Sequence, residues 1–249
     1  MDITYKDHIV AFIDVLGFSA LVNSGTTDKL QEYFEYVLDE FSEDRKSYKF
    51  DYILISDAIV IYADSKKANF ESLCRAISKL QMKLIMRGII MRGGISFGTL
   101  YLNKEKSVIV GSALINAYKL EQEAIYPRVT IDRGFIRLFY KNSQNMLQRN
   151  KGNILLDPPA PYQADLPYIY FTRKLALVMQ KSKLDSVVEL LEHNLSQNKN
   201  AQKYLWLKNH IEKALDDQLQ YLDEKPSKNK RDERRIRILE EFKEKVEVI

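Results

Sequence analysis

The feature that most constrains this chain is an early alternation of short apolar segments with longer segments of helical periodicity. The run from His8 to Asp14 is apolar and rich in β-forming residues, which predicts a buried strand ending in a carboxylate. Gly17 then allows the chain to turn. After an N-cap cluster at 24–27, apolar residues from Leu30 to Phe41 share one helical face. The chain therefore begins with a strand followed by an amphipathic helix.

A second aspartate lies at a predicted hairpin. Tyr52–Ile55 and Ile59–Tyr62 are apolar and β-forming, and only Ser56-Asp57-Ala58 separates them. A spacer this short predicts two antiparallel strands joined by a tight turn. Asp57 is therefore expected near the tip of the hairpin.

The following segments complete a recognisable order of elements. Apolar spacing predicts a helix from Phe70 to Leu84 that stops near Gly88, and a β-like stretch covers Ile89 to Leu102. The resulting order, β-α-β-β-α-β, matches a ferredoxin-like sheet with helices packed on one face. We therefore expect an α+β fold, with a further helix after Gly111.

The rest of the chain predicts a helical extension. Shorter strands are expected near 128–131 and 168–171, and the Pro-rich stretch 142–167 is typical of turns. Beyond it the apolar pattern is helical, with a charged, solvated linker at 224–235 before a last helix. We accordingly divide the chain into a domain of residues 1–172 and a helical C-terminal extension of residues 173–249.

Composition narrows the possible partners. The 38 basic and 34 acidic residues give a net charge of only +4, which does not indicate nucleic-acid binding. A single cysteine, Cys74, rules out an internal disulfide and suits a reducing compartment. The first residues lack a signal-peptide pattern, and Asp57 interrupts the longest apolar segment. We expect a cytoplasmic protein that does not span a membrane.

The two aspartates predict a metal site if their strands are neighbours in the sheet. Mg²⁺ and Mn²⁺ favour a few carboxylate oxygens, water and substrate phosphates, whereas zinc prefers His and Cys. Between the aspartates, the turn Val15-Leu16-Gly17-Phe18-Ser19 offers backbone N–H groups that can receive phosphate oxygens. Taken singly, Asp14 is equally well explained as a structural residue and Asp57 as a turn former.

Four segments resemble, in order, the motifs of class III nucleotidyl cyclases. They are Phe12-Ile13-Asp14-Val15-Leu16-Gly17-Phe18-Ser19, Ile55-Ser56-Asp57-Ala58, Arg92-Gly93-Gly94-Ile95-Ser96-Phe97-Gly98 and the helix from Gly111 to Glu121. The resemblance covers roughly residues 8–131. It implies a ferredoxin-like class III cyclase domain that works as a head-to-tail homodimer with shared active sites.

The reaction implied is attack of a ribose 3′ hydroxyl on the α-phosphate of a nucleoside triphosphate, with pyrophosphate leaving. In that family two Mn²⁺ or Mg²⁺ ions sit on the aspartates, here Asp14 and Asp57, and a main-chain group of Ile13 or Val15 completes one ion's shell. The amides of Leu16, Gly17, Phe18 and Ser19 would hold the terminal phosphates.

The chain departs from the family on the transition-state helix. Lys119 aligns with the family's arginine, and Ile115 with its asparagine, with Asn116 one step away. A lysine can neutralise charge on the α-phosphate but lacks the guanidinium fork. Lys119 is equally well explained as a surface lysine.

The base-reading positions also depart. They are Ile53 and Val108, and neither can read a purine edge with its side chain. A helical tail and an altered base pocket resemble the pyrimidine cyclases of Pycsar antiphage defence, which implies that UTP or CTP is cyclised to activate a separate effector. We favour UTP. The alternatives are an adenylate or guanylate cyclase with an atypical pocket and an inactive cyclase-fold nucleotide sensor.

Two further residues are candidate substrate contacts. Tyr52 flanks the altered pocket position and could narrow it for a smaller ring, although a buried strand tyrosine explains it better. Arg92 could approach phosphate or base, or form an ion pair across the dimer.

Overall fold

The chain forms two compact units. The computed structural model describes residues 3–23, 27–106, 108–150, 152–156, 166–196 and 200–249. One unit comprises Met1–Leu80 and Ile90–Tyr170, and the other comprises Gln81–Ile89 and Phe171–Ile249. We predicted a boundary at residue 172 from the sequence. The grouping of Gln81–Ile89 with the C-terminal helices was not predicted.

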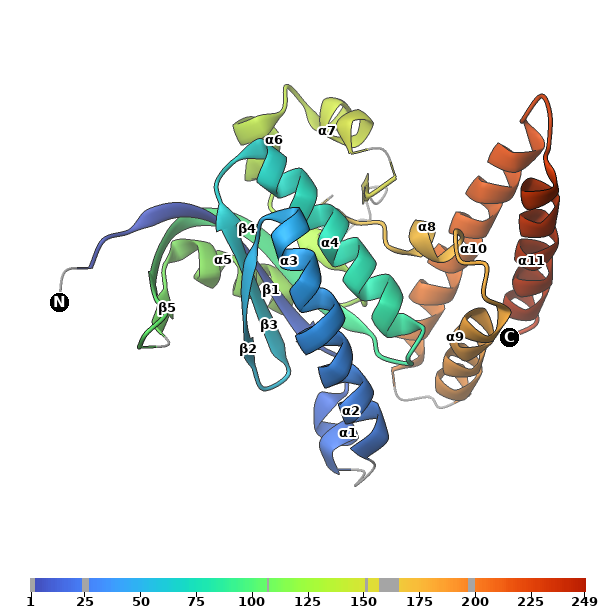
Figure 1. Ribbon diagram of the computed structural model, residues 1–249, viewed down its shortest axis with the longest axis horizontal. Helices are drawn as coiled ribbons and strands as arrows, with labels where there is room; N and C mark the ends of the chain where they lie inside the picture. The colour runs from blue at the N-terminus through green and yellow to red at the C-terminus, as the bar shows by residue number, and fades with distance from the viewer. Residues whose placement is uncertain (1–2, 24–26, 107, 151, 157–165, 197–199) are drawn as a thin grey trace. The chain divides into compact units, whose positions relative to one another are not determined.

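The first unit contains the sheet and the helices that cover it (Figure 1). Its elements are β1 (Lys6–Val15), α1 (Phe18–Asn23), α2 (Thr27–Glu35), the π-helix η1 (Tyr36–Glu40), α3 (Phe41–Tyr48), β2 (Asp51–Ile55), β3 (Ala58–Asp64), most of α4 (Lys67–Ile85), β4 (Met91–Asn103), β5 (Val108–Val110), α5 (Ser112–Glu123), β6 (Val129–Ile131), α6 (Gly134–Phe139), α7 (Ser143–Arg149), β7 (Ile154–Leu156) and β8 (Pro167–Ile169).

The sheet confirms the predicted α+β architecture. Its strands are ordered β2-β3-β1-β4-β6-β8-β7, with β5 paired to β4. The first four pair with one another in antiparallel fashion, in the order of a ferredoxin-like sheet, and β6 then pairs parallel to β4. β1 is the central strand, and it pairs with β3 from His8 to Asp14 and with β4 from Lys6 to Val15.

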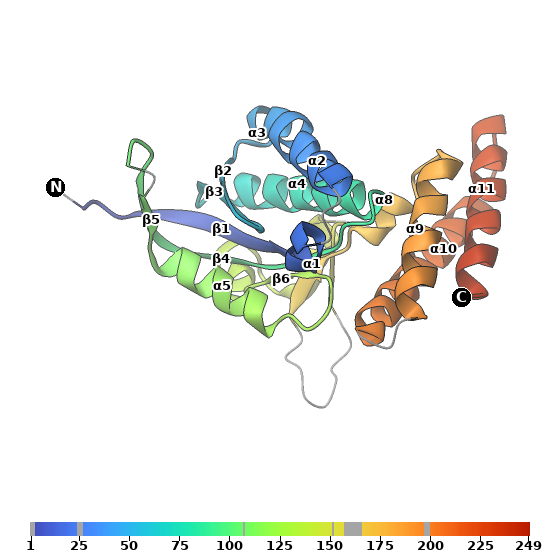
Figure 2. The ribbon, with the colours of Figure 1, turned by 90° about the horizontal axis from the view of Figure 1, so that it is seen from below.

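Side chains of β1 alternate between two covered faces. Val10 lies on one face, in a core cluster with Ala113 and Ala117 of α5. Ile9 and Ile13 point to the opposite face, where they are fully buried. Figure 2 shows α3 and α4 on one side of the sheet and α5 on the other. The expectation of helices on one face was therefore incomplete, because α5 covers the second face.

The first helical region differs in detail from the prediction. The N-cap expected at 24–27 falls mostly outside the described residues, and a short helix, α1, precedes it. From Thr27 to Tyr48 the chain stays helical through α2, η1 and α3. The π-helical turn lets Tyr36 and Val37 remain buried along with Phe41.

The second unit is helical. It contains α8 (Thr172–Leu175), α9 (Lys181–Leu195), α10 (Ala201–Asp223) and α11 (Lys230–Glu247). α9, α10 and α11 contact one another through apolar faces, whose fully buried members include Val187, Leu191, Leu207, Ile211, Leu215, Leu222, Leu239 and Val246. Among the described residues, no helix combines the length and apolar character needed to cross a membrane.

The predicted charged linker at 224–235 was wrong over its second half. α11 begins at Lys230, because Asn229 caps it in a reciprocal pair with Asp232. The Asn229 side chain accepts from the Asp232 amide at 3.0 Å, and Asp232 accepts from the Asn229 amide at 3.3 Å. A capping box of this kind starts a helix within a highly charged sequence.

Gly94 provides a test of the packing between the sheet and α5. A β-carbon at this position would collide with the Ala117 carbonyl oxygen and the Leu120 β-carbon. We expect Gly94→Ala to reduce the free energy of unfolding by about 1–3 kcal/mol, because α5 must shift. Urea denaturation followed by circular dichroism measures it. Glu123→Ala, on the exposed side of α5, should change it by less than about 0.5 kcal/mol. Equal effects of the two variants would contradict this close approach.

Candidate functional site

Asp14 and Asp57 lie at the same end of the sheet. Asp14 is opposite Ala58 in the β1–β3 register, and Asp57 immediately precedes Ala58 in the two-residue turn after β2. The Val15 amide donates to the Asp57 carbonyl at 3.1 Å. Ser56 adopts a positive φ of 56°, which closes this tight hairpin. The strands that carry the two aspartates are therefore neighbours, as the predicted metal site requires.

The turn after Asp14 presents fewer free amides than the sequence suggested. The Leu16 amide donates to the Ile90 carbonyl at 2.9 Å, and the Val15 amide is engaged by Asp57. The prediction that the Leu16 amide holds phosphate is thus corrected, because that N–H already has a partner. Gly17 adopts a φ of 79° and has open space around its α-carbon. The amides of Gly17, Phe18 and Ser19, where α1 begins, remain the candidates for phosphate binding.

Arg92 lies beside Asp14 and is held by a buried carboxylate. The two residues are opposite each other in the β1–β4 register, and Arg92 Nε lies 3.7 Å from Asp14 Oδ2. The same Nε lies 2.5 Å from Glu121 Oε1, on an α5 side chain that is only 1% exposed. Neither atom has an aligned hydrogen bond among the described residues, so the contact is an ion pair. Arg92 therefore forms an ion pair within the chain, and a contact with substrate stays a prediction.

Tyr33 of α2 is a neighbour of the two aspartates that the sequence did not single out. It is fully buried, and burial raises the pKa of its hydroxyl far above the usual range, with Asp57 and Asp14 adding to the rise. Its hydroxyl has no hydrogen-bond partner within the described part of the chain. The neutral Tyr33 hydroxyl, which has no hydrogen-bond partner among the described residues, thus lies close enough to both carboxylates for their negative charge to raise its pKa.

The charges at this end of the sheet fit a hard divalent cation. Asp14 and Asp57 supply carboxylate oxygens, and the main-chain carbonyl of Val15 is a third oxygen in the same short segment. The unpartnered Tyr33 hydroxyl could bond a metal-bound water. Oxygen donors without a cysteine or histidine suit Mg²⁺ or Mn²⁺.

The outer face of α5 presents the residues predicted to act on the α-phosphate. Ala113, Ala117 and Glu121 are buried on the inner face, whereas Asn116 and Lys119 are exposed. Large apolar side chains of β5 and α5 are also exposed, namely Val108 (40%), Val110 (42%), Ile115 (52%) and Tyr118 (47%). This combination gives α5 and β5 an apolar surface with a basic group on it.

The two positions that the resemblance assigns to base reading, Ile53 and Val108, lie in different surroundings. Ile53 of β2 is partly buried against the core cluster around Val10 and Val60, while Val108 of β5 is 40% exposed. Tyr52 alternates to the other face of β2, where its hydroxyl donates to the Val37 carbonyl at 3.1 Å. Its ring lies 5.6 Å from that of Phe41. This packing corrects the idea that Tyr52 narrows the base pocket.

Comparisons with known proteins add structural relatives only. No protein-family model and no curated protein match this chain. The chain is similar to the adenylyl cyclase CyaB from P. aeruginosa, with 14% identity, 68% of this chain and 96% of that chain covered, and a TM-score of 0.47. It is also similar to the guanylyl cyclase Cya2, with 12% identity, coverage of 68% and 92%, and a TM-score of 0.46. A third similar structure is the guanylyl cyclase domain of the RhoGC fusion protein from the aquatic fungus Blastocladiella emersonii. Its identity to this chain is 13%, 68% of this chain and 98% of that chain are covered, and the TM-score is 0.47. At these identities and TM-scores, the similarity does not establish a family for this chain.

The ion pair of Arg92 with Glu121 can be tested by its effect on stability. We expect Arg92→Met to lower the free energy of unfolding by about 3 kcal/mol, because the buried Glu121 carboxylate loses its cation. Denaturant titration measures the loss. The double variant with Glu121→Leu removes the stranded charge, so it should recover a large part of the stability. Additive losses in the double variant would contradict the pairing.

Proposed function

We propose that this protein is a nucleotidyl cyclase of the class III type. The observation that carries the proposal is the β1–β3 register, which puts Asp14 opposite Ala58 and therefore next to Asp57 at one end of the sheet. Both aspartates lie in segments that resemble the metal motifs of these enzymes. The Arg92 segment and α5 follow in the same order along the chain.

Each group at this end of the sheet has a proposed role. The carboxylates of Asp14 and Asp57 and the carbonyl of Val15 would hold two Mn²⁺ or Mg²⁺ ions. Bound there, the ions would lower the pKa of the ribose 3′ hydroxyl and stabilise the charge on the phosphates. The amides of Gly17, Phe18 and Ser19 receive oxygens of the terminal phosphates. Arg92, anchored by Glu121, keeps the Asp14 carboxylate oriented.

The proposed active form is a homodimer in which each site uses two chains. Lys119 and Asn116 of one chain would act on the α-phosphate held by the aspartates of the other. The exposed apolar side chains Val108, Val110, Ile115 and Tyr118 support this arrangement, because a second copy would bury them together with the helix that carries Lys119.

The proposed substrate is a pyrimidine nucleoside triphosphate, with UTP favoured over CTP. Ile53 and Val108 offer no side-chain hydrogen bond to a purine edge, so a site built on them gains no purine selectivity from these positions. The product would be a 3′,5′-cyclic monophosphate that activates a separate effector in the cytoplasm, as in antiphage signalling of the Pycsar type. A purine cyclase and an inactive nucleotide sensor are the alternatives.

The activity is tested by supplying each of the four nucleoside triphosphates with Mn²⁺ and identifying products by mass spectrometry. We expect cyclic UMP or cyclic CMP to dominate. Asp57→Asn keeps the hairpin shape but weakens the metal site, and should lower turnover by about a hundredfold or more. Asp39→Asn, at an exposed position of η1, should retain full turnover.

The outcomes separate the alternatives. A dominant cyclic AMP or cyclic GMP product would overturn the pyrimidine assignment and leave the metal site intact. Nucleotide binding without turnover would favour the sensor. Unchanged turnover in Asp57→Asn would contradict the metal mechanism. Mn²⁺ binding by electron paramagnetic resonance provides a readout that does not depend on turnover.

Shared active sites can be tested by mixing two inactive variants. Asp57→Asn lacks the metal half of the site, and Lys119→Ala lacks the partner's half. Random exchange of subunits in an equal mixture should restore about a quarter of wild-type turnover, because half of the dimers then contain one intact site. Asp57→Asn mixed with Asp14→Asn is the matched control and should stay inactive. Absence of recovery despite subunit exchange would contradict a site shared between chains.

A further inference from the structure

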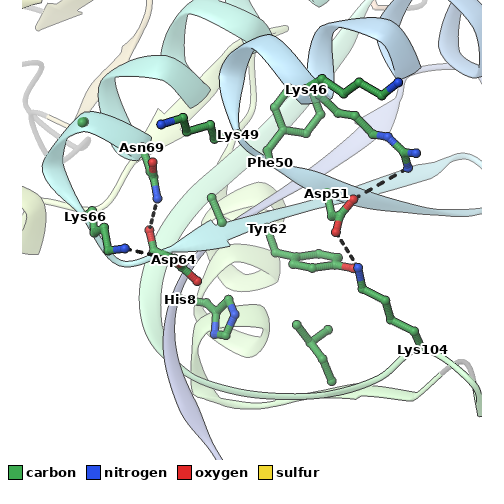
Figure 3. Close-up of a pocket in the computed structure, with 14 residues that line it drawn as sticks. His8, Lys46, Lys49, Phe50, Asp51, Tyr62, Asp64, Lys66, Asn69 and Lys104 are labelled. Atoms are coloured by element: carbon green, nitrogen blue, oxygen red, sulfur yellow. Dashed lines mark hydrogen bonds and ion pairs between the residues drawn. The ribbon is translucent and has the colours of Figure 1, made fainter.

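A basic cavity lies at the opposite end of the sheet from Asp14 and Asp57. Its volume is about 700 Å³, within the roughly 300–1,000 Å³ typical of small-molecule sites. Figure 3 shows it among the end of α3, the β2–β3 strands, the start of α4 and the β4–β5 hairpin. His8 lines this cavity and is six residues before Asp14 on β1, a separation of roughly 20 Å along an extended strand.

Positive charge dominates the lining. Five cationic side chains face two carboxylates, which leaves three positive charges in excess; the cations are Arg45, Lys46, Lys49, Lys66 and Lys104, and the acids are Asp51 and Asp64. Such an excess in a concave site attracts anions more strongly than the same charges on a convex surface.

Two of the lysines are not neutralised. Lys46 and Lys49 make no hydrogen bond or ion pair with any residue that the structure describes. The other cations are paired: Lys104 lies 2.5 Å and Arg45 lies 3.7 Å from oxygens of Asp51, and Lys66 lies 3.4 Å from Asp64. Figure 3 shows the Lys49 side chain on the Asn69 side of the cavity and the Lys46 side chain extending the opposite way. Lys49 is therefore the free cation that an anionic group in the cavity would approach, and Lys46 adds positive charge nearby.

The cavity also has an apolar and aromatic wall. Tyr62 contributes a nearly buried ring, with Lys104 Nζ 6.0 Å from its centroid and the His8 ring at 6.4 Å in an edge-on arrangement. Phe50 and Leu102 complete this wall. A ligand that combines an anionic group with a flat ring would match both parts of the lining.

We infer that this cavity binds a phosphorylated small molecule with a planar ring, of the size of a nucleoside monophosphate. The phosphate would lie against Lys49, and the ring against the wall that contains Tyr62. A cavity of about 700 Å³ has the size of one such molecule, and the chain's net charge of only +4 gives no broad basic surface for a nucleic-acid polymer.

This site would be separate from the proposed catalytic site. Asp51 and Tyr62 are paired across β2 and β3 at one end of the hairpin, and Asp57 lies in the turn at its other end. A molecule in the cavity and a metal-bound nucleotide at Asp57 could therefore be bound together. The inference does not depend on the cyclase activity.

Calorimetric titration with uridine 5′-monophosphate, adenosine 5′-monophosphate and inorganic phosphate tests the site, with EDTA present to keep the metal site empty. We expect the nucleotides to bind more tightly than phosphate. Lys46→Ala with Lys49→Ala should weaken binding by roughly tenfold to a hundredfold. Arg137→Ala with Lys141→Ala removes two exposed charges of the same unit elsewhere and should leave binding unchanged. Tyr62→Leu should reduce the preference for nucleotide over phosphate.

Further variants separate this cavity from the metal site. Asp57→Asn should bind the monophosphates as tightly as the wild-type chain does. Loss of binding in Asp57→Asn would show that the ligand occupies the catalytic site and overturn the proposal. Three other results would also overturn the proposal. The first is that neither monophosphate binds at millimolar concentration, and the second is that the lysine pair and the control pair weaken binding equally. The third is that the cavity binds a single-stranded oligonucleotide and not the monophosphates. Thermal unfolding of each variant confirms that it is folded.

Discussion

The antiparallel pairing of β1 with both of its neighbours is the constraint on which the rest of the structure depends. Its register with β3 brings Asp14 next to the turn that holds Asp57, and its register with β4 brings Arg92 to the other side of Asp14. A slip of one residue would turn Asp14 to the opposite face and bring Ile13, which is fully buried, to the face that Asp14 now occupies. The burial of β1 on both faces therefore fixes the position of the carboxylate, and core packing and site geometry have the same cause.

Several carboxylates lie near Arg92 at this end of the sheet, and Arg92 forms ion pairs with two of them. Arg92 pairs closely with buried Glu121 and more distantly with Asp14, so its charge is largely used by Glu121. Asp57 adds a further negative charge, which contributes to the raised pKa of the Tyr33 hydroxyl. An arrangement with excess carboxylate is costly in a partly buried place unless a cation offsets it. A divalent cation bound there, as proposed, would offset this negative charge.

The sequence predicted what depends on local periodicity and missed what depends on distant packing. The hairpin around Asp57, the strand ending at Asp14 and the helix after Gly111 follow from patterns within a few residues. The partner of Arg92 could not be predicted, because Glu121 is on a helix 29 positions later and looks like a surface residue in its polar segment. From the sequence, Tyr33 was interpreted only as one of the apolar residues on the helical face from Leu30 to Phe41. The start of α11 was missed because a capping box at Asn229 outweighed the charge run.

The two positions proposed to read the base differ in how easily they can be substituted. Ile53 packs against a cluster that includes Val10, Val60 and Tyr62, so a polar side chain there would lose apolar burial and require its own partner. Val108 is 40% exposed on β5, which forms only three residue pairs with β4, and its replacement should disturb little of the folded chain. In the proposed dimer, Val108 would become buried only on association. Changes in substrate preference would therefore arise most readily at Val108, whereas Ile53 is held by the core that also positions β1.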